Sequence, residues 1–177
     1  MGTAAYLGGA GDLVSAPDIL GVAGSILVVE GRHNGWISSA VLHEQPWNGA
    51  FEASLDQNQV FTLAAGFITS CPDSNPALPF TANPGLTVQG TPKPGDITKF
   101  DFETSESGTL YAAFLSGLTP TFVELSADKS AAIPEGLLGT VYVVITTNNY
   151  SAKDADTVAG PAILSFPFDS TVSNALA

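Results

Sequence analysis

Glu30 and His33 are the two residues whose types and spacing most directly indicate chemistry. They lie three positions apart within an apolar, helix-periodic stretch, so both side chains would leave a helix on one face. Glu-x-x-His units of this kind supply carboxylate and imidazole ligands to two-metal sites in helical bundles. Because the sequence has one such unit, we expect at most two or three ligands from it, too few for tight binding by this chain alone. For the isolated chain we favour a Glu–His hydrogen bond or two exposed polar residues.

The helix that carries this pair should begin at Ser15-Ala16-Pro17-Asp18, where Ser15 can cap and Pro17 suits the first turn. Apolar residues recur at helical spacing as far as Val41, which predicts a core helix that ends near His43. Trp36 would then contribute to core packing. The longest apolar run has 11 residues, from Ile19 to Val29. A membrane span needs about 20 residues, so we expect none.

The pattern changes from helical to strand-like along the chain. A shorter helix is expected after Ser54-Leu55-Asp56-Gln57, which has the form of a capping box. Beyond it, alternating apolar residues punctuated by Gly and Pro predict strands. These strands are residues 86–88, 97–102, 110–115, 121–125, 140–145 and 162–166. The fold class we predict is α+β: a partial helical region (1–69), a linker (70–84) and an antiparallel, immunoglobulin-like β-sandwich (85–177).

Composition excludes several classes of function. The 177 residues include 17 acids and 5 bases, for a formal charge of −12, and 45% are hydrophobic. A chain this acidic lacks the basic surface that nucleic acid or anionic membranes require. Cys71 is the only cysteine, so neither an internal disulfide nor a cysteine-based zinc site can form. We expect its thiol to be buried or partly buried.

Several segments carry a family likeness. In the first half they are Ala5-Tyr6-Leu7-Gly8, Ala23-Gly24-Ser25-Ile26-Leu27, Val29-Glu30-Gly31-Arg32-His33, Asn58-Gln59-Val60-Phe61-Thr62-Leu63-Ala64 and Ser70-Cys71-Pro72. Together they resemble the ferritin-like domain of fungal stress-response and desiccation-related proteins. In the second half, 110–118 and 158–162 are similar to the C-terminal part of the fungal members. The resemblance covers nearly the whole chain.

The resemblance implies a metal site and a missing partner. Glu30 and His33 match the ligand pair of the family's fourth helix, and a completed four-helix site would hold iron or manganese. On that pattern Met1 falls inside the third helix, so we expect a C-terminal fragment whose first two helices lie outside this chain. The family likeness and the sequon Asn149-Tyr150-Ser151 favour a secreted or cell-wall glycoprotein, with its signal peptide outside this chain.

The resulting expectation is a structural module without catalytic residues and without a cofactor of its own. Its long helix would be covered by the missing N-terminal helices or by further copies of the chain, giving a homo-oligomer. The alternative is a dinuclear iron or manganese protein in which this chain supplies half of the site. A third interpretation, a carbohydrate- or surface-binding role for the sandwich, rests only on aromatic platforms at Tyr111, Tyr142 and Tyr150. Whether the chain has enzymatic activity stays open, with no activity favoured.

Overall fold

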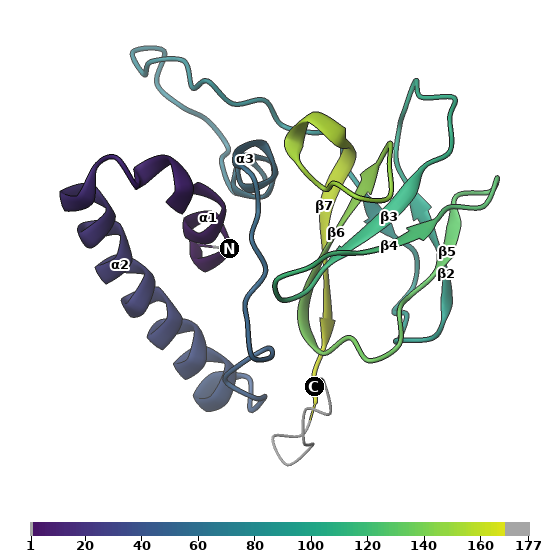
Figure 1. The fold of residues 1–177 in the computed structure, drawn as a ribbon, viewed down its shortest axis with the longest axis horizontal. Helices are drawn as coiled ribbons and strands as arrows, with labels where there is room; N and C mark the ends of the chain where they lie inside the picture. The colour runs from purple at the N-terminus through teal and green to yellow at the C-terminus, as the bar shows by residue number, and fades with distance from the viewer. Residues whose placement is uncertain (1, 169–177) are drawn as a thin grey trace.

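The computed structural model describes residues 2–168 and has three α-helices followed by two antiparallel sheets. The predicted α+β class is therefore confirmed. The helices are α1 (Gly2–Gly9), α2 (Pro17–Trp36) and α3 (Gln57–Ala65). Figure 1 shows α2 at one edge of the molecule, the two sheets at the other, and α1 and α3 between them. Among the described residues, no helix is long and apolar enough to cross a membrane.

Helix α2 differs from the predicted core helix in its N-cap, in its last turn and in its burial. Its N-cap is Ala16 and no side chain caps it, so Ser15 does not have the predicted role. Its last turn widens into a π-helix, Ile37–Val41, and the chain reverses at His43, where φ is +58°. More importantly, no side chain of α2 is buried anywhere along its fully described length. Its main contacts are with α1, with the 3₁₀ turn Ala10–Leu13 and with the π-helix that follows it.

Helix α3 is anchored to the sheets by its first turn. Its N-cap is Asp56, with Gln59 as the partner residue of the capping box, so the predicted start at Ser54 is two residues early. The Asp154 carboxylate accepts hydrogen bonds from the backbone N–H of Asn58 (2.8 Å) and Gln59 (3.3 Å). In return the Asp56 carboxylate accepts from the backbone N–H of Asp154 (3.0 Å). The helix start therefore depends on the loop before the last strand.

The seven strands form one sheet of three and one of four, in the orders β1-β2-β5 and β4-β3-β6-β7. Their bounds are β1 (Thr87–Val88), β2 (Ile97–Asp101), β3 (Tyr111–Leu115), β4 (Thr121–Glu124), β5 (Ser130–Ala132), β6 (Gly139–Thr146) and β7 (Thr157–Phe166). All described pairings are antiparallel. Sequence patterning found six of these strands but missed β5 and the first half of β7.

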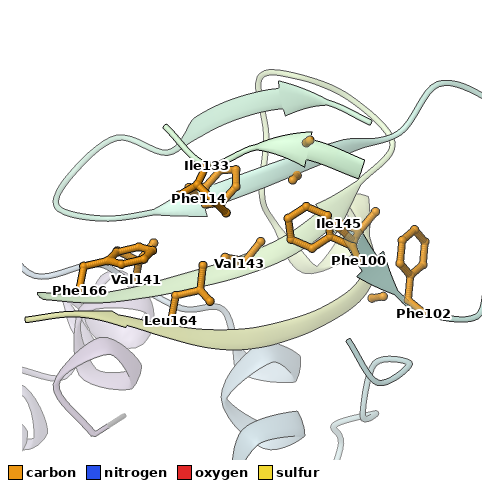
Figure 2. Close-up of a cluster of buried hydrophobic side chains, with 12 residues drawn as sticks. Phe100, Phe102, Phe114, Ile133, Val141, Val143, Ile145, Leu164 and Phe166 are labelled. Atoms are coloured by element: carbon orange, nitrogen blue, oxygen red, sulfur yellow. The ribbon is translucent and has the colours of Figure 1, made fainter. Parts of the chain in front are cut away.

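The main core lies between the two sheets (Figure 2). Phe100 of β2 and Phe114 of β3 meet edge-on there, with ring centroids 6.4 Å apart. A second cluster lies on the opposite face of β3 and β6, where Tyr142 and Val144 pack with Ala4 and Leu55 from the helical region. These two strands are thus buried on both faces, because the helical region covers the face that the second sheet leaves free.

Candidate metal centre and the exposed stripe of helix α2

The structure separates Glu30 from His33, because Glu30 lies in the contact between α1 and α2 and His33 lies outside it. Glu30 is half-buried, and its carboxylate lies directly against the backbone of Gly2 at the start of α1. His33 is exposed, one turn further along α2. The two residues are on one helix, as predicted, but α1 covers only the first of them.

These two donors do not by themselves fit a bound metal ion. Among the described residues, no group of three or more His, Cys, Asp or Glu side chains could hold one. Iron or manganese would take a carboxylate and an imidazole readily, but tight binding needs further ligands. Any such centre would therefore require donors from outside the described chain.

Helix α2 presents two adjacent stripes of side chains. The first consists of Leu20, Ala23, Leu27 and Glu30, which are half-buried. Gly24 beside them lets the Tyr6 hydroxyl approach, since a Cβ atom at position 24 would lie 3.4 Å from the hydroxyl oxygen. This stripe faces α1, as the contacts of Glu30 and Gly24 with α1 show.

The second stripe, which we call the bare stripe, is exposed. Its members recur at alternating intervals of three and four residues, the spacing of a helix–helix seam. They are Ile19 (58% exposed), Val22 (62%), Ile26 (53%), Val29 (40%), His33 and Trp36 (64%). Trp36 is thus not a core residue of this chain, contrary to prediction. The third side of the helix carries Ser25, Arg32 and glycines, with Val28 as its large apolar residue.

Glu30 and His33 therefore have unequal surroundings. The carboxylate is held at the α1 contact, whereas the imidazole belongs to the bare stripe and would face whatever covers it. Sequence periodicity identified both residues but not this division. The signal that separates them is the three-four spacing, since position 30 is absent from the series of positions 19, 22, 26, 29, 33 and 36.

Asn149, the predicted glycosylation site, is exposed in the connection between β6 and β7. The preceding Asn148 organises this turn, because its Oδ1 accepts from the backbone N–H of Tyr150 (3.1 Å) and Ser151 (2.8 Å). Its Nδ2 donates to Asp156 Oδ1 at 2.8 Å. A glycan at position 149 would extend from an ordered, accessible turn.

Cys71 is more accessible than expected. Cys71 is a free, exposed cysteine, so the prediction of a buried or partly buried thiol is wrong. It lies in an irregular segment in which no strand or helix provides cover. Arg32 is exposed and makes no ion pair with any described residue.

Tyr142, which packs against the helical region, has a shifted pKa. Burial in the second core cluster raises the pKa of its phenol, and the negative charge of Glu52 raises it further. The cause is desolvation, which disfavours the phenolate. This perturbation reflects the packing of Tyr142 between the four-stranded sheet and the helical region.

Comparison with known proteins supports the helical part of the resemblance. The family model for the ferritin-like domain matches residues 1–43, the segment that forms α1, α2 and the π-helical turn. No curated protein matches the chain with significance. The N-terminal quarter is therefore similar to part of a ferritin-like domain, and the match stops before α3 and the sheets.

Proposed function

We propose that this chain is a non-catalytic structural module that assembles through the bare stripe of α2. The observation that carries the proposal is the exposure of five large apolar side chains in register along one side of a helix whose other stripe packs on α1. Contiguous apolar surface of this kind marks interaction sites. The covering helices would come from further copies of the chain or from N-terminal helices of the same protein outside it.

The energetics favour such an assembly. These five residues retain between 40% and 64% of their accessible surface. Removing that surface from water contributes roughly 1 kcal/mol per side chain. Five of them together supply roughly 5 kcal/mol, which is offset in part by the entropy lost on association.

The proposal is tested by Ile26→Glu in the bare stripe, with Val28→Glu as the matched control. The two residues are comparably exposed, at 53% and 60%, and lie on the same helix. Light scattering coupled to size exclusion should show association of the unmodified chain and of Val28→Glu, but not of Ile26→Glu. If neither substitution alters the mass, or if all three proteins are monomers, the bare stripe is not an assembly surface.

A second candidate is a dinuclear iron or manganese protein in which this chain supplies half of the ligands. It is favoured by the position of His33 within the bare stripe, because donors carried by a covering helix would arrive beside it. Elemental analysis of protein prepared with each metal tests this function. Stoichiometric metal that is lost in Glu30→Ala and His33→Ala supports it, and its absence from the assembled protein excludes it.

The same proposal includes the origin and location of the protein. We place it among secreted or cell-wall proteins similar to the fungal stress-response group, with a glycan on Asn149. The exposed sequon turn supports this assignment. Expression through a secretory pathway should give a glycosidase-sensitive mass shift that Asn149→Gln removes. A native mass identical to that of Asn149→Gln would remove the glycan from the proposal.

A further inference from the structure

The longest run of exposed residues in the described chain is the loop 66–79, between α3 and the sheets. Exposed loops are the preferred sites of cleavage by proteases. We propose that an endoprotease with an apolar primary pocket cuts this loop at the Phe67–Ile68 bond, and that the two products remain one folded molecule. The step is a hydrolysis: water adds across the peptide bond and leaves a carboxylate on Phe67 and an ammonium group on Ile68. This inference does not depend on the bare stripe.

The backbone at the start of the loop is weakly held. Helix α3 ends at Ala65, and a single turn follows in which the Phe67 N–H donates to the Ala64 carbonyl (3.0 Å). The Ile68 N–H donates in the same way to the Ala65 carbonyl (3.1 Å). Figure 1 shows the chain then looping away from both α3 and the sheets. A protease binds an extended segment, so cleavage requires these two hydrogen bonds to open at a helix end, where local opening costs little.

The side chains of the loop select the class of protease and the bond. Phe67 is 82% exposed, more than any other large hydrophobic residue that the structure describes. It suits an enzyme whose primary pocket is a hydrophobic slot. The loop contains no Lys or Arg, which excludes a trypsin-like enzyme. Leu78 is also exposed, but it precedes Pro79, and a peptide bond to a proline nitrogen resists enzymes of this kind.

Exposure alone does not select the site, because two other exposed aromatic residues lie in backbone that is held in place. Phe51 is 59% exposed, but Ala53, two residues later, is buried in the second core cluster. Tyr150 is exposed, but its N–H and that of Ser151 are bound by the Asn148 side chain. A protease cannot take up either segment in extended form without breaking these contacts. Phe67 therefore differs from them in its backbone as well as in its exposure.

The chain returns to α3 directly after the loop. The backbone N–H of Thr81 donates to Asn58 Oδ1 at 3.0 Å. The backbone N–H of Asn83 donates to Thr62 Oγ1 at 2.8 Å. Both hydrogen bonds join a residue before the cut to a residue after it. Each flank of the loop is thus fixed to the same helix, and cleavage between the flanks releases neither.

Further contacts across the cut do not involve the loop. Asn48 Oδ1 accepts from the Thr140 backbone N–H at 2.8 Å, which ties the segment before α3 to the start of β6. Leu55 is 1% exposed and packs in one cluster with Val144 of the four-stranded sheet. The hydrogen bonds between the first turn of α3 and the connection before β7 also remain. Cleavage turns these contacts into an association between two fragments, and we expect them to outweigh its entropic cost.

Limited digestion of the full chain with chymotrypsin tests the site and the fate of the products together. Mass spectrometry should identify the first products as fragments 1–67 and 68–177. Without denaturant they should elute with the uncut chain in size exclusion, and urea should separate them. Phe67→Ser should lose this first cut, whereas the control Phe51→Ser, at another exposed phenylalanine, should keep it.

Thr69→Arg gives a second route to a cut pair, because no Lys or Arg occurs from position 33 to position 92. Trypsin should cut this variant first after position 69, and the products should again elute together. A first chymotryptic cut outside the loop 66–79, or a chain left intact where its urea-unfolded form is digested, overturns the inference. Fragments that separate without urea overturn it equally. None of these results alters the mass of the uncut chain, so the proposed assembly function is tested separately.

Discussion

The α carbon of Gly8 in α1 lies against the carbonyl oxygen of Leu55, with no space for a side chain between them. One turn earlier, the Ala4 carbonyl accepts a hydrogen bond from the Leu55 backbone N–H at 3.1 Å. Helix α1 therefore docks edge-on to the extended segment that leads into α3. This contact joins the helix pair α1–α2 to the rest of the fold.

Gly8→Ala should destabilise the protein, because the new methyl group would overlap the Leu55 carbonyl and force the backbones apart. Overpacking of this kind costs about 1–3 kcal/mol. Gly9→Ala is the matched control, since nothing lies within 4 Å of a side chain at that position. Alanine should be neutral there or stabilising by up to about 1 kcal/mol. Urea unfolding of both variants measures the difference, and equal stabilities would refute the Gly8 contact.

Gln59→Leu should destabilise the contact between α3 and the sheets. Gln59 is fully buried, and its side-chain amide donates to the Ala152 carbonyl (2.7 Å) and to Thr157 Oγ1 (3.1 Å). Leucine would leave these acceptors without partners, at a cost of about 1–3 kcal/mol for each buried group.

The control for this substitution is Gln57→Leu, in the same turn of α3 but exposed. Its single described contact is a 3.2 Å hydrogen bond to Asp12. We expect a change within about 0.5 kcal/mol there, as for most surface positions. Thermal or urea unfolding that ranks the two variants in the opposite order would show that the Gln59 hydrogen bonds do not hold α3 in place.

Tyr142→Phe should reduce the loss of stability in alkali. The pKa of Tyr142 is raised in the folded protein, above the usual value of about 10. Its contribution is therefore complete below pH about 10 and decreases as pH rises toward the folded pKa, because the unfolded chain loses its proton first. The free energy of unfolding between pH 9 and pH about 11 should fall less steeply in Tyr142→Phe. Tyr150→Phe replaces a residue that is 80% exposed and serves as the control. If the free energy of unfolding falls equally steeply with pH in Tyr142→Phe, Tyr150→Phe and the unmodified protein, Tyr142 is not the group responsible.

Local sequence patterns predicted most of the strands, since side chains on β3 and β6 alternate between two buried faces. The missed elements lack such a signal. Strand β5 contains only Ser130 and two alanines, and β7 passes through Gly160 and Pro161, residues that normally interrupt strands. Proline is tolerated there because β7 lies at the edge of its sheet. Pairing with distant strands, which local patterns do not encode, decides both cases.

The candidate site was predictable only in part. Helical spacing placed Glu30 and His33 on one helix, and it also indicated that α2 has an apolar face. Periodicity cannot show what covers such a face, and the structure shows that the described chain packs α1 on one side of it and leaves the other side exposed. The same limit applies to α3, whose start depends on Asp154, a residue almost one hundred positions away, and not on Ser54.

Burial of Trp36 provides the most direct measurement of the central claim. Trp36 is 64% exposed in the single chain and lies at the end of the bare stripe. With Trp47 replaced by Phe, its fluorescence reports that stripe alone, because the chain has two tryptophans. Acrylamide quenching should weaken as the protein concentration rises through its association range, and Ile26→Glu should abolish this protection. Quenching that stays equally strong at every concentration would contradict assembly through α2.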